Sequence, residues 1–126
     1  QTMVVLNNNG KGITMTNTGQ SYPIDKNGEI LKINSPQSSL GGPFVVVFKN
    51  IEERWAIVAI TWDGLPRLGI RWFWGTLGQP VSMTHGTWLV IPPSLSKGIL
   101  ASLPLDHAFS GRLDDFLCGK IKGTEL

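Results

Sequence analysis

The chain has 126 residues, of which 41% are hydrophobic and 16% are charged, and its formal net charge at pH 7 is +2. A chain of this length predicts one globular domain over residues 1–126, with a core that can form without disulfides or metals. The net charge is too small to indicate a nucleic-acid partner by itself, because dedicated binders usually carry a strong basic patch. No apolar run approaches the roughly 18 residues of a membrane span.

Cysteine content and the start of the chain bear on location. Cys118 is the only cysteine, so neither an intrachain disulfide nor a Cys-x-x-Cys motif can form. No basic segment followed by an apolar one opens the chain, so no signal peptide is visible and we expect a cytoplasmic protein. One interpretation of Gln1 and Thr2 is that they are additions ahead of a natural start at Met3.

Turn-forming dipeptides divide the first half of the chain into hairpins. Asn9-Gly10, Asn27-Gly28 and Asp63-Gly64 all accept the positive φ values of tight turns. Each lies between short runs suited to strands, which are 3–6 and 13–16, then 22–24 and 29–33, then 55–62 and 67–74. Together these signals indicate antiparallel β structure.

The segments around the third hairpin are also read as loops and strands. Residues 44–48 are apolar on both faces, which predicts a central strand covered on both sides. Residues 34–43 contain many strand breakers and are expected to form a loop. A further strand is expected at 88–91, and it should end at Pro92-Pro93 because proline cannot donate to a sheet ladder.

Helical spacing appears only after this point. Ser94 is expected to cap a first helix carrying Leu95, Ile99 and Leu103. A second helix is expected from about Ser110, because apolar residues recur there at intervals of three to four. The predicted fold is therefore α+β: a predominantly antiparallel sheet within residues 3–91, with a small, partly open barrel as one arrangement, and two short helices within 94–122 packed on one face.

Side-chain alternation in the Asp63-Gly64 hairpin separates two faces. If the loop has two or four residues, one face is a core face with Trp55, Ile57, Ala59, Leu68, Ile70, Trp72 and Trp74. The other face carries arginines among aromatic and aliphatic residues, namely Arg54, Ala56, Val58, Ile60, Trp62, Arg67, Gly69, Arg71 and Phe73.

The arginine-bearing face has two interpretations. Other elements could cover its aliphatic part while the arginines reach water along their apolar stems. Alternatively it is a binding surface, with Arg54, Trp62, Arg67, Arg71 and Phe73 as candidate contact residues. Tryptophan, arginine and phenylalanine are enriched where interfaces concentrate their energy, so the favoured partner is another protein or a second copy in a homo-oligomer. Single-stranded nucleic acid, stacked on the same rings, is the alternative.

Catalytic candidates are weak. His85 and His107 are far apart and have no second ligand at a metal-binding spacing, and Asp106 is best explained as a helix or turn cap. Cys118 is expected to be a small buried hydrophobe on the last helix. We therefore expect a non-catalytic binding module without metal or cofactor. A small-ligand binder or enzyme, with a pocket between sheet and helices that uses His85 or Asp106, is the second alternative.

Overall fold

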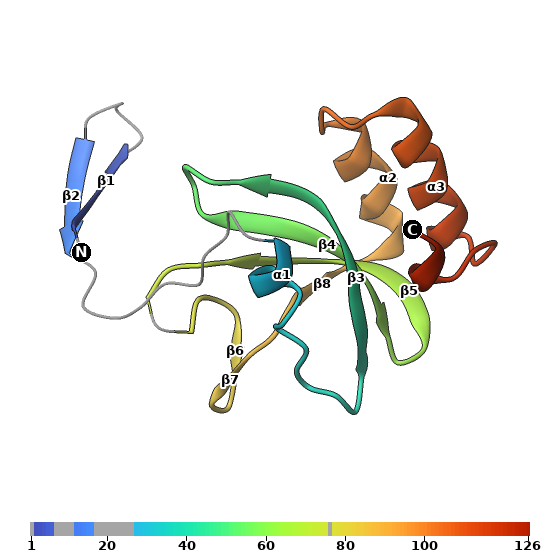
Figure 1. The fold of residues 1–126 in the computed structure, drawn as a ribbon, viewed down its shortest axis with the longest axis horizontal. Coiled ribbons are helices and arrows are strands. Elements are labelled where there is room, and N and C mark those ends of the chain that lie inside the picture. Colours follow the sequence, from blue (N-terminus) through green and yellow to red (C-terminus); the bar gives the residue numbers. More distant parts are fainter. Residues whose placement is uncertain (1, 7–11, 17–26, 76) are drawn as a thin grey trace.

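The computed structural model describes residues 2–6, 12–16, 27–75 and 77–126, with side chains described from Gly28 onward. The elements in chain order are β1 (Thr2–Leu6), β2 (Gly12–Thr16), α1 (Asn27–Ile30), β3 (Leu40–Asn50), β4 (Trp55–Trp62), β5 (Leu65–Trp72), β6 (Val81–Ser82), β7 (His85–Gly86), β8 (Leu89–Ile91), α2 (Pro93–Ala101), α3 (His107–Leu117) and the 3-10 helix η1 (Gly123–Glu125). This is an α+β fold, as predicted (Figure 1).

The hairpin at Asp63-Gly64 forms as its turn chemistry predicts. Asp63 and Gly64 have φ values of 51° and 80°, and Trp62 pairs with Leu65 across a two-residue loop. Strand β4 has the predicted bounds, whereas β5 begins and ends two residues earlier than predicted. A two-residue loop is one of the two registers that give the predicted division into faces, and the packing of the paired strands confirms that division for β4 and β5. It does not hold for Arg54 and Trp74, which were predicted on opposite faces, because the Arg54 guanidinium lies 5.7 Å from the centroid of the Trp74 ring.

The main sheet has four antiparallel strands in the order β3-β4-β5-β8 and is not closed, so the barrel arrangement is not realised. The prediction that residues 44–48 form a central strand is wrong, because β3 lies at an edge and most of its residues are only half-buried. The two interior strands are β4 and β5, and residues 56–60 of β4 are all buried. The expected loop at 34–43 also ends early, since β3 begins at Leu40.

The two other hairpin predictions have different outcomes. Strands β1 and β2 pair antiparallel from Thr2–Thr16 to Leu6–Gly12, as predicted, and their turn lies outside the described residues. The hairpin predicted at Asn27-Gly28 is wrong, because these residues begin the single helical turn α1 where a strand turn was expected. The first strand predicted for that hairpin, 22–24, lies outside the described residues. Further along the chain, β6 pairs with β7 in a separate short ribbon.

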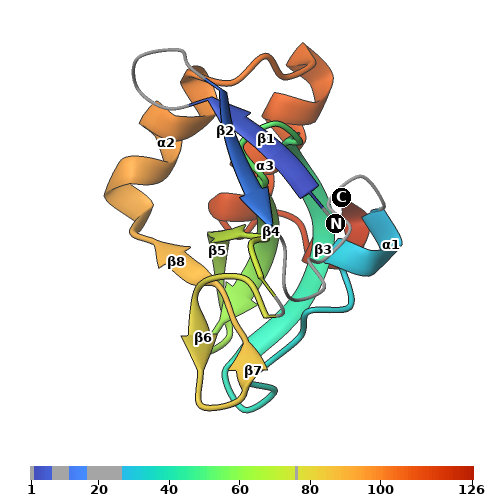
Figure 2. The same ribbon diagram turned by 90° about the vertical axis from the view of Figure 1, so that its left-hand side faces the viewer.

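The C-terminal helices pack on one side of the sheet, as predicted. Helix α2 starts at Pro93 after Pro92, with no side-chain cap, so the capping role predicted for Ser94 is wrong. Helix α3 starts at His107, where the Asp106 carboxylate accepts a 3.2 Å hydrogen bond from the Phe109 amide, which confirms Asp106 as a cap. Both views show these helices on one side of the sheet and the β6–β7 ribbon on the other (Figure 1, Figure 2).

Both faces of the sheet are covered, and each covering has its own core. On the helix-covered face, Ile57, Ala59, Leu68 and Ile91 pack with Leu100, Leu113 and Phe116. On the opposite, loop-covered face, Ala56, Val58, Ile60 and Phe73 pack with Ile30, Ile33, Leu40 and Trp88. Among the helices in the described part of the chain, none combines the length and apolar character needed to cross a bilayer.

Candidate functional site

The predicted arginine-bearing face is the loop-covered face, and the structure does not present its five candidate residues as one surface. Arg71 and Phe73 are both 0% exposed. In this arrangement neither can contact a partner, because the segments that contain Ile33 and Trp88 lie over this side of the sheet. Arg71 and Phe73 therefore fit the interpretation in which other elements cover this face.

Arg71 is a structural anchor for the chain that covers it. Its Nη1 donates to the carbonyl oxygens of Thr87 at 2.5 Å and of Pro80 at 3.4 Å, and its Nη2 donates to that of Leu77. Its guanidinium also lies 5.9 Å from the centroid of the Trp88 ring. Backbone carbonyls in irregular segments need donors when they are buried, and Arg71 supplies several at once.

The other three predicted residues are half-buried and lie at different places. Arg54 donates from Nε to the Phe73 carbonyl at 3.2 Å, and its guanidinium lies 5.7 Å from the centroid of the Trp74 ring. Arg67 donates from Nη1 to the Pro66 carbonyl at 2.7 Å. Arg67 lies beside the β4–β5 turn, whereas Arg54 precedes β4, so the two arginines are at opposite ends of the hairpin. Binding roles for Arg54, Trp62 and Arg67 stay predictions.

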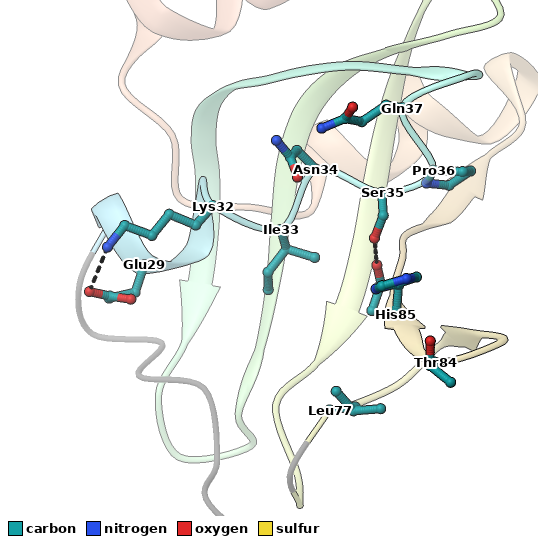
Figure 3. Close-up of a pocket in the computed structure, with 11 residues that line it drawn as sticks. Glu29, Lys32, Ile33, Asn34, Ser35, Pro36, Gln37, Leu77, Thr84 and His85 are labelled. Carbon is teal, nitrogen blue, oxygen red and sulfur yellow. Dashed lines mark hydrogen bonds and ion pairs between the residues drawn. The ribbon is translucent and has the colours of Figure 1, made fainter.

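A polar cavity of about 650 Å³ lies between α1, the segment that follows it and the β6–β7 ribbon (Figure 3). Lys32 and Glu29 on its rim pair with each other at 3.2 Å. Ser35 donates from its hydroxyl to the Gly86 carbonyl, which ties the segment after α1 to β7. His85 also lines this cavity and is exposed. Lys32 and Glu29 are paired with each other and Ser35 with the Gly86 carbonyl, while Asn34, Gln37, Thr84 and His85 add further polar side chains to the lining.

A cavity between the sheet and the helices exists, but it does not contain the residues predicted for it. Its volume is about 410 Å³ and its lining includes Ser96, Asp114 and Cys118, not His85 or Asp106. Cys118 is exposed at the end of α3, so the prediction that it is buried is wrong. In the part of the chain that the structure describes, no three metal-ligating side chains come together.

An apolar groove lies on the helix-covered face. We call it the β8–α2 groove; its volume is about 550 Å³, and it is lined by Trp55, Ile57, Ile70, Trp72, Leu89, Val90, Ile91, Pro92, Leu95, Ile99, Ser102 and Leu103. Trp55 and Trp72 are paired in the β4–β5 ladder, so their side chains project from the same face of the sheet at one end of the hairpin. None of the lining residues is charged.

Exposed leucines mark this groove as a surface rather than a core. Leu89 is 53% exposed and Leu95 is 56% exposed, although both are large apolar side chains. Leu95 lies in the first turn of α2 and Leu89 begins β8, so they come from the two elements that border the groove. The exposed apolar parts of this groove therefore lie in two leucines on its border, one from each element.

Sequence reasoning found the residues of this groove but not their role. The sequence predicts a core face that contains Trp55, Ile57, Ile70 and Trp72, and it predicts that Leu95 and Ile99 belong to a helix that packs on the sheet. Ile57, Ile70, Trp55 and Ile99 do pack in the helix-covered core, whereas Leu95 is 56% exposed, so its predicted packing on the sheet is wrong. The chain matches no protein-family model, no curated protein and no solved structure.

Proposed function

We propose that this chain is a non-catalytic protein-binding domain and that the β8–α2 groove is the surface that contacts its partner. The observation that carries the proposal is an uncharged apolar groove with half-exposed leucines, Leu89 and Leu95, on its border. Fully burying a leucine side chain contributes about 1.5–3 kcal/mol, so burying the exposed half of each would contribute about 1 kcal/mol.

The tryptophans add to this argument. Trp55 and Trp72 are half-buried in the groove and keep part of their rings available. Tryptophan is among the residues that carry most of the binding energy at protein interfaces, particularly where surrounding contacts exclude water. Two tryptophans beside two exposed leucines therefore suit an apolar side chain or segment of another protein.

The chemistry of the groove also favours binding over catalysis. Its lining has one hydroxyl, that of Ser102, and no carboxylate, imidazole, thiol or amine. Ser102 donates from its Oγ to the Ile99 carbonyl at 2.7 Å. General acid–base catalysis needs a positioned group that can exchange a proton, and nucleophilic catalysis needs an activated nucleophile. These residues supply neither.

Selection from a library of random peptides tests the proposal. The protein is immobilised at low density, so that copies do not meet, and the affinity of the selected peptides is then measured against variants. Leu95→Lys is expected to weaken binding about tenfold, equivalent to about 1.4 kcal/mol. Leu65→Lys is the matched control, because Leu65 is also 53% exposed but begins β5 beside the β4–β5 turn, outside the groove.

Two results would contradict the proposal. The first is a failure of the wild-type protein to select any peptide. The second is selection of peptides that bind Leu95→Lys as well as they bind the wild type, which would place the binding surface elsewhere, for example at Arg54, Trp62 or Arg67.

A further inference from the structure

We infer that the partner at the β8–α2 groove is a second copy of this chain, joined through antiparallel pairing of the two β8 strands; this rests on the proposed function. Strand β8 is the last strand of the sheet and pairs with β5 on one side only. Within the described residues, no backbone hydrogen bond is made on its outer side. An open edge of this kind is a template for another strand.

The two edges of the sheet differ in how they are protected. Strand β3, at the opposite edge, contains Pro43 and Lys49 and has two register shifts against β4. Proline, lysine and bulges are the features that natural proteins use to prevent edge pairing. Strand β8 has the sequence Leu89-Val90-Ile91, with none of these features. Of the two edges of the four-stranded sheet, the β8 edge is therefore the one without these features.

Symmetry favours a copy of the chain over an unrelated partner. Antiparallel pairing of a strand with its own copy creates a two-fold axis, so the same patch faces itself across the interface. Residues near such an axis meet their own kind, and like charges there would repel. The groove and β8 carry no charge, although the whole chain has a net charge of +2. Two copies can thus meet at this patch without charge repulsion.

The patch combines a hollow with exposed apolar side chains on its border. Its hollow has a volume of about 550 Å³, and the side chains that border it, Leu89 and Leu95, are more than half exposed. Pairing of the β8 strands extends the sheet into the second copy and brings the leucines of each copy to the groove of the other. An isologous interface requires this self-complementarity.

The leucine contacts should contribute more to association than the hydrogen bonds between the two β8 strands. A three-residue strand can add only a few hydrogen bonds, and each contributes little net free energy because it replaces hydrogen bonds to water. Substitution of the leucines should therefore affect association strongly, while the strand pairing sets the orientation. We expect Leu95→Lys and Leu89→Lys each to raise the dimer dissociation constant about tenfold or more.

Sedimentation equilibrium over a concentration series, from micromolar to near-millimolar protein, tests the inference. The wild type is expected to reach twice the 13.8 kDa mass of the chain. Leu95→Lys and Leu89→Lys should remain monomers to much higher concentration, and Leu65→Lys should dimerise like the wild type. Circular dichroism verifies that each variant is folded.

Hydrogen exchange on the wild type provides a measurement that needs no variant. The amides of Leu89, Val90 and Ile91 that face outward should exchange more slowly at concentrations where the dimer forms, while the exposed amides of the β4–β5 turn should not change. Two results would overturn the inference. One is a wild type that is monomeric at all concentrations. The other is a dimer that forms equally well in both leucine variants and does not slow hydrogen exchange at the β8 amides.

The outcomes also separate this inference from the function on which it rests. A monomer whose groove still selects peptides, with binding lost in Leu95→Lys, keeps the protein-binding function and rejects the second copy as partner. A monomer that selects no peptide rejects both.

Discussion

Helices cover one face of the β4–β5 hairpin and irregular segments cover the other, and different interactions hold each covering on the sheet. On the helix-covered face, the contacts with the helices are apolar, with Leu113 and Phe116 buried against Ile57 and Leu68. On the loop-covered face, Arg71 and Trp88 donate hydrogen bonds to backbone carbonyls. The Trp88 Nε1 donates to the Ile33 carbonyl at 2.8 Å.

The difference follows from backbone hydrogen bonding. A helix satisfies most of its own N–H and C=O groups, so it can cover a sheet with apolar side chains alone. An irregular segment leaves carbonyls without partners, and a buried carbonyl without a donor costs about 1–3 kcal/mol. A sheet covered by irregular chain therefore needs donors that reach out from the sheet or from the segment itself. Arg71 and Trp88 have this role.

The largest loss of stability is expected from substitution of Arg71, on the loop-covered face. Arg71→Met keeps much of the apolar volume but removes the donors to Leu77, Pro80 and Thr87. We expect the free energy of unfolding to fall by about 3 kcal/mol or more, because several buried acceptors lose their donor. Urea denaturation measures it.

Leu113→Met is the matched substitution on the helix-covered face. Leu113 is also fully buried, but no hydrogen bond depends on it, so this change should cost less than about 1.5 kcal/mol. Equal costs at the two positions would mean that volume alone, and not backbone satisfaction, distinguishes the two faces.

Two tryptophans allow a smaller test of the same idea. Trp88→Phe removes a buried donor to the Ile33 carbonyl and should lower the free energy of unfolding by about 1–3 kcal/mol. Trp55→Phe removes the 3.2 Å hydrogen bond from its Nε1 to Glu53 Oε1, which is exposed to water. This second change should cost less than about 1 kcal/mol, and thermal unfolding of both variants measures the difference. A larger loss at Trp55 would contradict the explanation.

The smallest effects concern the starts of the two helices. Asp106→Ala removes the hydrogen bond from the Phe109 amide and should lower the free energy of unfolding by about 1 kcal/mol. Ser94→Ala should change it by less than about 0.5 kcal/mol, because α2 begins after Pro92 without a side-chain cap. A loss at Ser94 as large as that at Asp106 would restore the capping role that the sequence suggests for Ser94.

The sequence determined the features that depend on neighbouring residues. The Asp63-Gly64 turn, the alternation along β4 and β5 and the Asp106 cap were all predicted, because turn chemistry, side-chain alternation and capping act over a few residues. Trp55 and Trp72, on the wall of the groove, could likewise be placed on the same face as the helices.

Tertiary structure decided what depends on segments that meet in space. Local pattern could not show that β3 lies at an edge, that Arg71 and Phe73 are covered, or that Leu89 and Leu95 remain exposed. Strand order determines which edge is open, and the path of residues 30–40 and 77–88 determines which face is buried. An arginine beside aromatic rings has the same sequence signature whether it meets water, a partner or buried carbonyl oxygens, because only packing selects among them.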